Sequence, residues 1–183
     1  MRLFVALEAP TETLTKLQDA LMYLQGLKHK DINWVKPENL HLTVNFIGEV
    51  AEHRLPELKA LLARQVQRFT APSLRAEGIE LFPHRFPRLI WLKLSGDDEV
   101  LKTLNRQTLS SLRALGIEAD AKSLKLHVTL GRIKSQQSAD FERAAMMYSF
   151  PEEERVWGTL SLYRSILHPS GPKYEIIEQY DLK

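Results

Sequence analysis

The chain has 183 residues, 25 Lys+Arg against 23 Asp+Glu for a formal charge of +2, and no Cys. The length predicts one domain or two small lobes with a shared core, and a hydrophobic content of 44% excludes a disordered chain. The absence of Cys excludes disulfide frameworks and thiol nucleophiles, and no apolar run approaches the ~18 residues of a membrane span. We therefore expect a cytoplasmic protein with no membrane partner.

Hydrophobic periodicity predicts helices and strands that alternate irregularly along the chain. The helices are expected over residues 11–27, 56–68, 101–115 and 138–147, with Ser138 as a candidate N-cap of the last. Strands are expected over residues 3–7, 33–35, 40–47, 74–81, 89–94, 124–130, 157–167 and 174–182. Because this order lacks strict βαβ alternation, it favours an α+β fold with mostly antiparallel sheets.

One combination of elements occurs twice. The helix that ends near residue 27 is followed 14 residues later by the run His41-Leu42-Thr43-Val44. The helix that ends near residue 115 is followed 12 residues later by His127-Val128-Thr129-Leu130. The two histidines are 86 residues apart, close to half the chain. This pattern predicts an internal duplication and a single two-lobed domain over residues 1–183.

Each of these strands places a His and a Thr on one face, because alternate side chains of a strand share a face. His41 and Thr43 form one such pair, and His127 and Thr129 form the other. With six His in 183 residues, chance predicts only about 0.3 His-x-Thr triplets, so two in matching context indicate a shared function. Two imidazoles can serve as general base and general acid, and two hydroxyls can donate to phosphate oxygens. The residues favour phosphodiester chemistry without a metal or other cofactor, since no third ligand lies at a metal-binding spacing.

The paired motifs resemble the 2H phosphoesterase superfamily, and the strings around them resemble its RNA 2′,3′-cyclic phosphodiesterase branch, also called 2′-5′ RNA ligases. These strings are Arg2-Leu3-Phe4-Val5-Ala6, Phe46-Ile47-Gly48, Phe82-Pro83, Leu89-Ile90-Trp91-Leu92, Gly131-Arg132, Leu162-Tyr163-Arg164-Ser165 and Gly171-Pro172-Lys173-Tyr174. The resemblance implies two pseudo-symmetric lobes, each an antiparallel sheet with outer helices, and an active-site cleft between them.

The same resemblance implies a reaction and a role for each motif residue. An RNA end with a 2′,3′-cyclic phosphate would be opened to a 2′-phosphomonoester, with His127 as the base towards water and His41 as the acid towards the ribose O3′. Thr43 and Thr129 would bind the phosphate. With an RNA 5′-hydroxyl in place of water, the same site would form a 2′-5′ linkage in a reversible ligation.

Further candidates for nucleotide binding lie beside the motifs. Strand alternation places Arg132 on the core side unless a bulge at Gly131 turns it forward, whereas the resemblance implies a phosphate or nucleotide contact for this Arg. Phe46 could stack on a terminal base, but its position in the alternation favours the core. Asn45 continues the front face of its strand and could border the cleft. Lys125 is either a phosphate contact or a solvated charge.

Two alternatives stay open. The protein could be a 2H phosphoesterase that acts on a small nucleotide cyclic phosphate, in which case trimming an RNA substrate would not lower kcat/KM. It could also be a nucleotide-binding module without turnover, which an imidazole turned away from the cleft would favour. A cleft enclosed by one chain predicts a monomer.

Overall fold

The computed structural model describes residues 1–151 and 153–183 and contains two antiparallel sheets. The four-stranded sheet contains, in spatial order, β3 (His41–Glu49), β1 (Arg2–Glu8), β8 (Thr159–Ile166) and β9 (Lys173–Asp181). The five-stranded sheet contains, in spatial order, β2 (Ile32–Trp34), β6 (His127–Ile133), β5 (Leu89–Gly96), β4 (Ser73–Phe82) and β7 (Arg155–Val156). The predicted α+β class with antiparallel sheets is confirmed.

The four predicted helices are also present. They are α1 (Thr11–Gly26), α2 (Leu55–Val66), α3 (Asp98–Ala114) and α4 (Ala139–Met146), and short 3-10 turns η1 (Pro37–Asn39) and η2 (Glu52–Arg54) precede β3 and α2. Ser138 caps α4 as predicted, since its Oγ accepts a bond from the backbone N–H of Phe141 at 3.1 Å. Helix α3 begins three residues before the predicted start, because the acidic Asp98 and Glu99 in its first turn suit the positive end of the helix dipole.

Two predicted strands have different limits in the structure. Strand β6 begins at His127 rather than at residue 124 and continues to Ile133. The expected strand over residues 157–167 is shorter in the structure, where β8 covers Thr159–Ile166. The two residues before it, Trp157 and Gly158, separate β8 from the short strand β7, and the backbone N–H of Trp157 donates to the Pro72 carbonyl at 2.9 Å.

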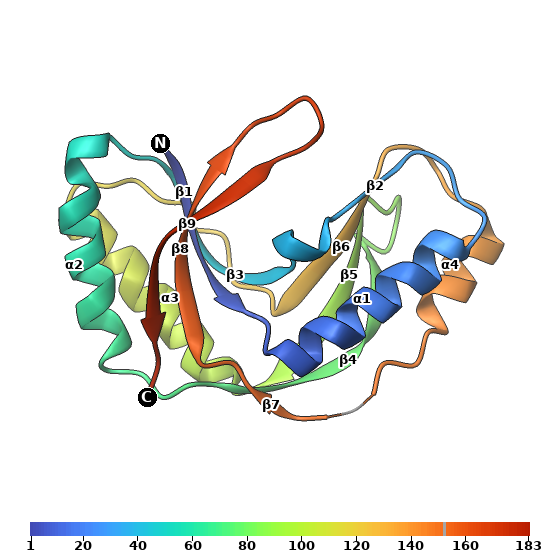
Figure 1. The fold of residues 1–183 in the computed structure, drawn as a ribbon, viewed down its shortest axis with the longest axis horizontal. Helices are drawn as coiled ribbons and strands as arrows, with labels where there is room; N and C mark the ends of the chain where they lie inside the picture. Colours follow the sequence, from blue (N-terminus) through green and yellow to red (C-terminus); the bar gives the residue numbers. More distant parts are fainter. Residues whose placement is uncertain (152) are drawn as a thin grey trace.

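Two of the helices, α1 and α3, each cover the sheet to which the strand before them does not belong. Helix α1 directly follows β1, yet Figure 1 shows it beside α4 over the five-stranded sheet, whereas α2 and α3 cover the four-stranded sheet. In α3, Asn105 donates to the carbonyl of Val44 in β3 at 2.7 Å, and Ser111 accepts a bond from Gln65 of α2 at 2.8 Å. One cluster of buried apolar side chains runs through both sheets, because the chain crosses between them repeatedly.

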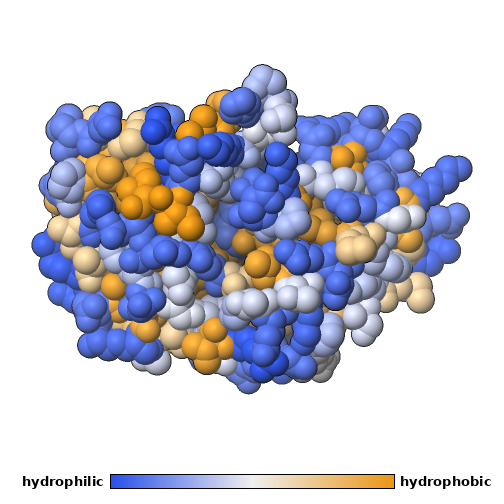
Figure 2. Space-filling view, in the orientation of Figure 1, coloured by the Kyte–Doolittle hydropathy of each residue, from blue (hydrophilic) through white to orange (hydrophobic). Residues whose placement is uncertain are grey.

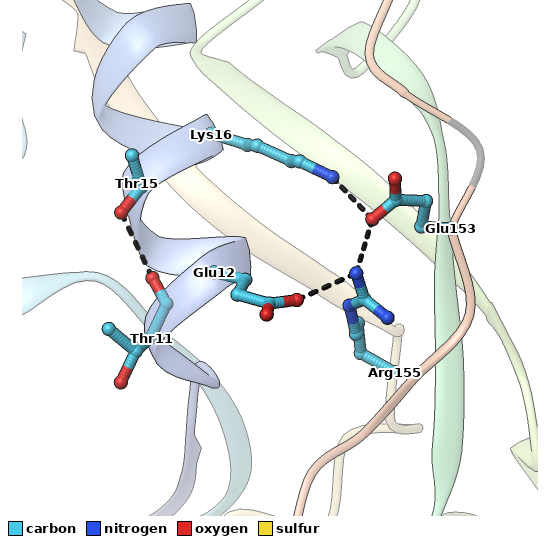
Figure 3. Close-up of polar contacts among 6 residues, drawn as sticks. All are labelled: Thr11, Glu12, Thr15, Lys16, Glu153 and Arg155. Carbon is cyan, nitrogen blue, oxygen red and sulfur yellow. Dashed lines mark hydrogen bonds and ion pairs between the residues drawn. The ribbon is translucent and has the colours of Figure 1, made fainter.

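An ion-pair network attaches α1 to the strand at the far edge of the five-stranded sheet. Figure 3 shows Glu153 bonded to both Lys16 and Arg155, at 2.5 and 2.6 Å, while Arg155 also reaches Glu12 at 2.6 Å. Single surface pairs contribute little to stability, but a shared network holds its members in one geometry. The network therefore fastens α1 against β7, where the chain returns towards the four-stranded sheet.

Figure 2 shows apolar residues gathered in several patches among hydrophilic residues on one face of the molecule. Large exposed apolar side chains include Phe46, Phe86 and Leu167, which are 56%, 73% and 74% exposed. Within the described residues 1–151 and 153–183, no helix has the length and apolar character to cross a membrane.

Candidate active site

The two His-x-Thr strands contact each other although they belong to different sheets. The segment before each motif strand hydrogen-bonds to the other motif strand. The N–H of Val35, ahead of β3, donates to the carbonyl of Leu130 in β6 at 2.9 Å. The N–H of Asp120, ahead of β6, donates to the carbonyl of Phe46 in β3 at 3.0 Å. These reciprocal bonds connect the two motif strands to each other.

Each motif strand contains a β-bulge directly after its Thr. In β3, Thr43 and Asn45 pair with consecutive residues of β1, which leaves Val44 as the extra residue. In β6, the matching shift leaves Leu130 as the extra residue. An extra residue reverses the alternation of faces beyond it. The residue five positions after each His therefore returns to the face that carries that His.

The bulges change where three candidate residues lie. The prediction that Asn45 borders the cleft is wrong, because the bulge turns it inward, where it is 2% exposed and donates to the Asn105 carbonyl at 3.3 Å. The core placement favoured for Phe46 is also wrong, because this ring is exposed and lies 6.3 Å from the Phe4 ring, which packs against His41. Arg132 is exposed on the site face of β6, since the bulge that this position required is present.

The bulged residues keep their backbone hydrogen bonds. The carbonyl of Val44 accepts a bond from Asn105 Nδ2, and the carbonyl of Leu130 accepts one from the Val35 N–H. Gly131 lies beside the second bulge and close to Trp34, because a Cβ at this position would be 3.0 Å from Cε3 of the Trp34 ring and would need that ring to shift. The carbonyl of the extra residue is thus satisfied in both bulges, as expected for buried backbone polar groups.

The two imidazoles are held by the same backbone contact. His41 Nδ1 lies 2.7 Å from the carbonyl of Asn39, and His127 Nδ1 lies 2.7 Å from the carbonyl of Lys125. A carbonyl can only accept a hydrogen bond, so the proton of each neutral ring resides on Nδ1. Nε2 is then the proton-exchanging atom of both rings. Nε2 of His41 lies 2.9 Å from Thr43 Oγ1.

Burial and nearby positive charge keep both histidines neutral near pH 7. Burial is the largest cause that lowers the pKa of His41 to about 4, the bond to Asn39 opposes it, and the charges of His127 and Arg132 add to it. Burial also lowers the pKa of His127, and the charges of Lys125 and Arg132 act in the same direction. Arg132 therefore acts electrostatically on both imidazoles. An anionic group bound between them would favour their protonated forms.

Aromatic rings that the sequence analysis did not assign to the site surround His41. The rings of Phe4, Tyr163 and Tyr174 lie 5.0, 5.8 and 5.5 Å from the imidazole centroid. Phe4 was missed because β1 is apolar on both faces, so its alternation gives no sign of a site. Tyr163 comes from β8, which pairs with β1, and Tyr174 comes from β9, which pairs with β8, so both rings reach the site from the other end of the chain.

A second aromatic contact supports His127. The indole of Trp91 lies 4.2 Å from the imidazole centroid, and its N–H donates to Glu80 at 3.3 Å. Trp91 in β5 pairs with Thr129 in β6. Within the described part of the chain, no group of three or more His, Asp or Glu side chains is placed to hold a metal ion.

Two antiparallel sheets that bring two His-x-Thr strands together form the architecture of a 2H phosphoesterase. A family model described as LigT like phosphoesterase matches residues 5–91. The RNA 2′,3′-cyclic phosphodiesterase of Archaeoglobus fulgidus is 33% identical over 99% of this chain and 100% of its own length. The protein of the same name from Thermotoga maritima is 29% identical over 97% of this chain and 93% of its own.

Solved structures agree with the sequence relatives. The crystal structure of TT0787 from Thermus thermophilus has a TM-score of 0.79 and 30% identity, with 100% of this chain and 98% of that chain covered. Escherichia coli LigT in complex with 3′-AMP shares the fold, with a TM-score of 0.73, 21% identity, and coverage of 99% and 97%. The chain belongs to the LigT-like phosphoesterase family, the 2H branch that contains the RNA 2′,3′-cyclic phosphodiesterases, and is an enzyme of this class.

Proposed function

We propose that the protein opens the terminal 2′,3′-cyclic phosphate of RNA to a 2′-phosphomonoester, with His41 and His127 as its two proton-transfer groups. The observation that carries this proposal is the matched pair of imidazoles, each held through Nδ1 by the carbonyl two residues before it and each offering Nε2. Relatives from two organisms that match nearly the whole chain bear the name RNA 2′,3′-cyclic phosphodiesterase, which supports the choice of substrate.

In this mechanism a water molecule attacks phosphorus in line with the ribose O3′, and the P–O3′ bond breaks. His127 takes a proton from the water, and His41 gives a proton to O3′. The lowered pKa values leave both rings neutral in the free protein, so the phosphate anion must raise the pKa of the acid as it binds. When an RNA 5′-hydroxyl takes the place of water, His127 takes its proton, the same P–O3′ bond breaks while His41 gives a proton to O3′, and a 2′-5′ linkage forms.

The remaining candidates hold the substrate. Thr43 and Thr129 donate hydrogen bonds to the non-bridging phosphate oxygens, and Arg132 balances the negative charge that develops there. The exposed ring of Phe46 offers a face on which the terminal base stacks. Because one chain supplies both motif strands, residues 1–183 act in this proposal as one bilobal monomer.

The test uses a short RNA that ends in a 2′,3′-cyclic phosphate, incubated with the protein in EDTA, with the 2′- and 3′-phosphate products resolved. We expect only the 2′-phosphate, and a loss of about 10²–10⁴-fold in rate in His41→Ala and in His127→Ala, as is usual when acid–base help is removed. His53→Ala is the matched control, because this exposed histidine lies in η2, outside both motifs.

Three outcomes would refute the proposal. A 3′-phosphate product would refute the regiochemistry, and full activity in either motif variant would refute two-histidine catalysis. An unchanged kcat/KM when the RNA is trimmed to a mononucleotide would assign the site to small cyclic nucleotides instead of RNA.

A further inference from the structure

Nδ1 of each motif histidine contacts the backbone carbonyl two residues before it, a contact that we call the carbonyl clamp. The residue that provides this carbonyl differs between the two histidines. Asn39 clamps His41, and its side-chain amide donates to the carbonyl of Pro172 at 3.2 Å. Lys125 clamps His127, and its ammonium lies over the ring of Phe82, 4.2 Å from the ring centroid. The residue that provides the carbonyl clamp is therefore charged at His127, where it is Lys125, and uncharged at His41, where it is Asn39.

The ring beneath Lys125 leads directly to His127. Phe82 stacks on Trp91 with centroids 4.3 Å apart and ring planes 19° apart. Trp91 in turn packs on His127 with centroids 4.2 Å apart. The Lys125 ammonium therefore lies on a series of three rings, which come from β4, β5 and β6 and which we call the stack. Lys125 contacts the first and the last of these rings, since its side chain lies over the phenyl ring and its backbone carbonyl contacts the imidazole.

The indole in the middle of the stack is fixed by a further contact. The Trp91 side chain is 5% exposed, and its bond to Glu80 sets the rotation of the indole. Glu80 also pairs with Lys93 at 3.5 Å, and Lys93 lies opposite His127 in the β5–β6 ladder. A cation over an aromatic face is attracted by the ring quadrupole, and the attraction is stronger when the pair is desolvated. His127 is thus contacted by the Trp91 indole as well as by the Lys125 carbonyl.

We propose that Lys125 is a positioning residue for His127, which acts through the Phe82–Trp91 stack and the carbonyl clamp and does not touch the substrate. The proposal rests on the proposed function of His127 as a proton-transfer group. It assigns Lys125 to neither of the two interpretations that the sequence left open, a phosphate contact or a solvated charge. His41 has no equivalent support, because its neighbours Phe4, Tyr163 and Tyr174 are uncharged rings.

The stack has an electrostatic consequence as well as a geometric one. The charged groups around His127 are Lys125 and Arg132 near its own strand, Lys93 and Glu80 from β5 and β4, and His41 from β3. Among them, Lys125 and Arg132 lower the pKa of His127. Removal of the Lys125 charge should therefore raise the pKa of His127, whereas disruption of the phenyl ring alone should leave most of that charge effect in place.

The test compares Lys125→Met, which keeps the stem but loses the charge, with Phe82→Leu, which keeps the charge but breaks the stack. Both should lower kcat on the cyclic-phosphate RNA by about 5- to 10-fold while KM changes less than 2-fold, because the loss is one of orientation. Only Lys125→Met should raise the pKa of His127 in an NMR titration of the imidazole. Lys125→Arg should restore kcat, since a guanidinium also stacks on an aromatic ring.

The matched control is Lys122→Met, because Lys122 lies on the same segment but pairs with Asp120 at 3.3 Å and should leave kcat and the titration unchanged. A Lys125→Met variant with raised KM, wild-type kcat and an unmoved titration would overturn the proposal and make Lys125 a phosphate contact. Wild-type kcat in Phe82→Leu would overturn the role of the stack. If the wild type did not hydrolyse the RNA, the proposed function would fail, and the titration in Lys125→Met would still test the link to His127.

Discussion

Replacement of His41 by Asn should make the protein less sensitive to acid. In the folded protein the pKa of His41 is lowered to about 4, whereas an ordinary imidazole has 6.5. The unfolded chain therefore takes up a proton on this side chain below about pH 6.5, and the folded protein does not until about pH 4. Protonation favours the unfolded state throughout this window, so stability falls as the pH is lowered through it.

The size of the effect follows from the two pKa values. At pH 5 the unfolded imidazole is almost fully charged and the folded one is mostly neutral, which costs about 2 kcal/mol of the free energy of unfolding relative to pH 8. Domains of this kind are stable by about 5–15 kcal/mol, so the difference is measurable by urea unfolding. The loss between pH 8 and pH 5 should be about 2 kcal/mol larger in the wild type than in His41→Asn, because all other groups are shared.

The exposed His53 supplies the control, since His53→Asn should show the wild-type pH dependence. Equal losses in the wild type and His41→Asn would refute the argument that His41 is held neutral. An NMR titration adds a direct check, because a nucleoside 2′-phosphate bound between the imidazoles should raise the pKa of His41. A titration of His41 that the nucleotide leaves unmoved would refute its place beside the phosphate.

Three further predictions concern catalysis, the fold and substrate binding. Thr43→Val and Thr129→Val should each lower kcat by about 10- to 100-fold, because each removes one hydroxyl that donates to a charged phosphate, and a loss larger than that of His→Ala would contradict the assigned roles. Asn105→Ala should lower the free energy of unfolding by about 1–3 kcal/mol, because the buried carbonyl of Val44 loses its hydrogen-bond partner. Urea unfolding measures this, and an unchanged midpoint of the urea transition would contradict this account of the bulge. Phe46→Ala should raise KM for the RNA about 10-fold through lost base stacking while kcat stays within 2-fold, and an unaltered KM would exclude this ring from the substrate contact.

The sequence predicted most of the secondary structure because its signals are local. The helix faces are visible from Leu17, Leu21 and Leu24, which recur at helical spacing and are buried as expected. The cap at Ser138 needs only the N–H three residues ahead. The limits of β6 and β8 were less accurate, because a strand ends where its partner ends, and the partners are distant in sequence.

The sequence by itself determined which side chains share a face in the two motif strands, because a His-x-Thr run in a strand places an imidazole and a hydroxyl on one face whatever the rest of the chain does. Only the tertiary structure decided what surrounds them. The bulges at Val44 and Leu130 arise from pairing with distant strands, and they bury Asn45 and turn Phe46 and Arg132 outward. The aromatic rings that pack against His41 and His127 likewise come from neighbouring strands. The alternation of side chains along one strand cannot specify them.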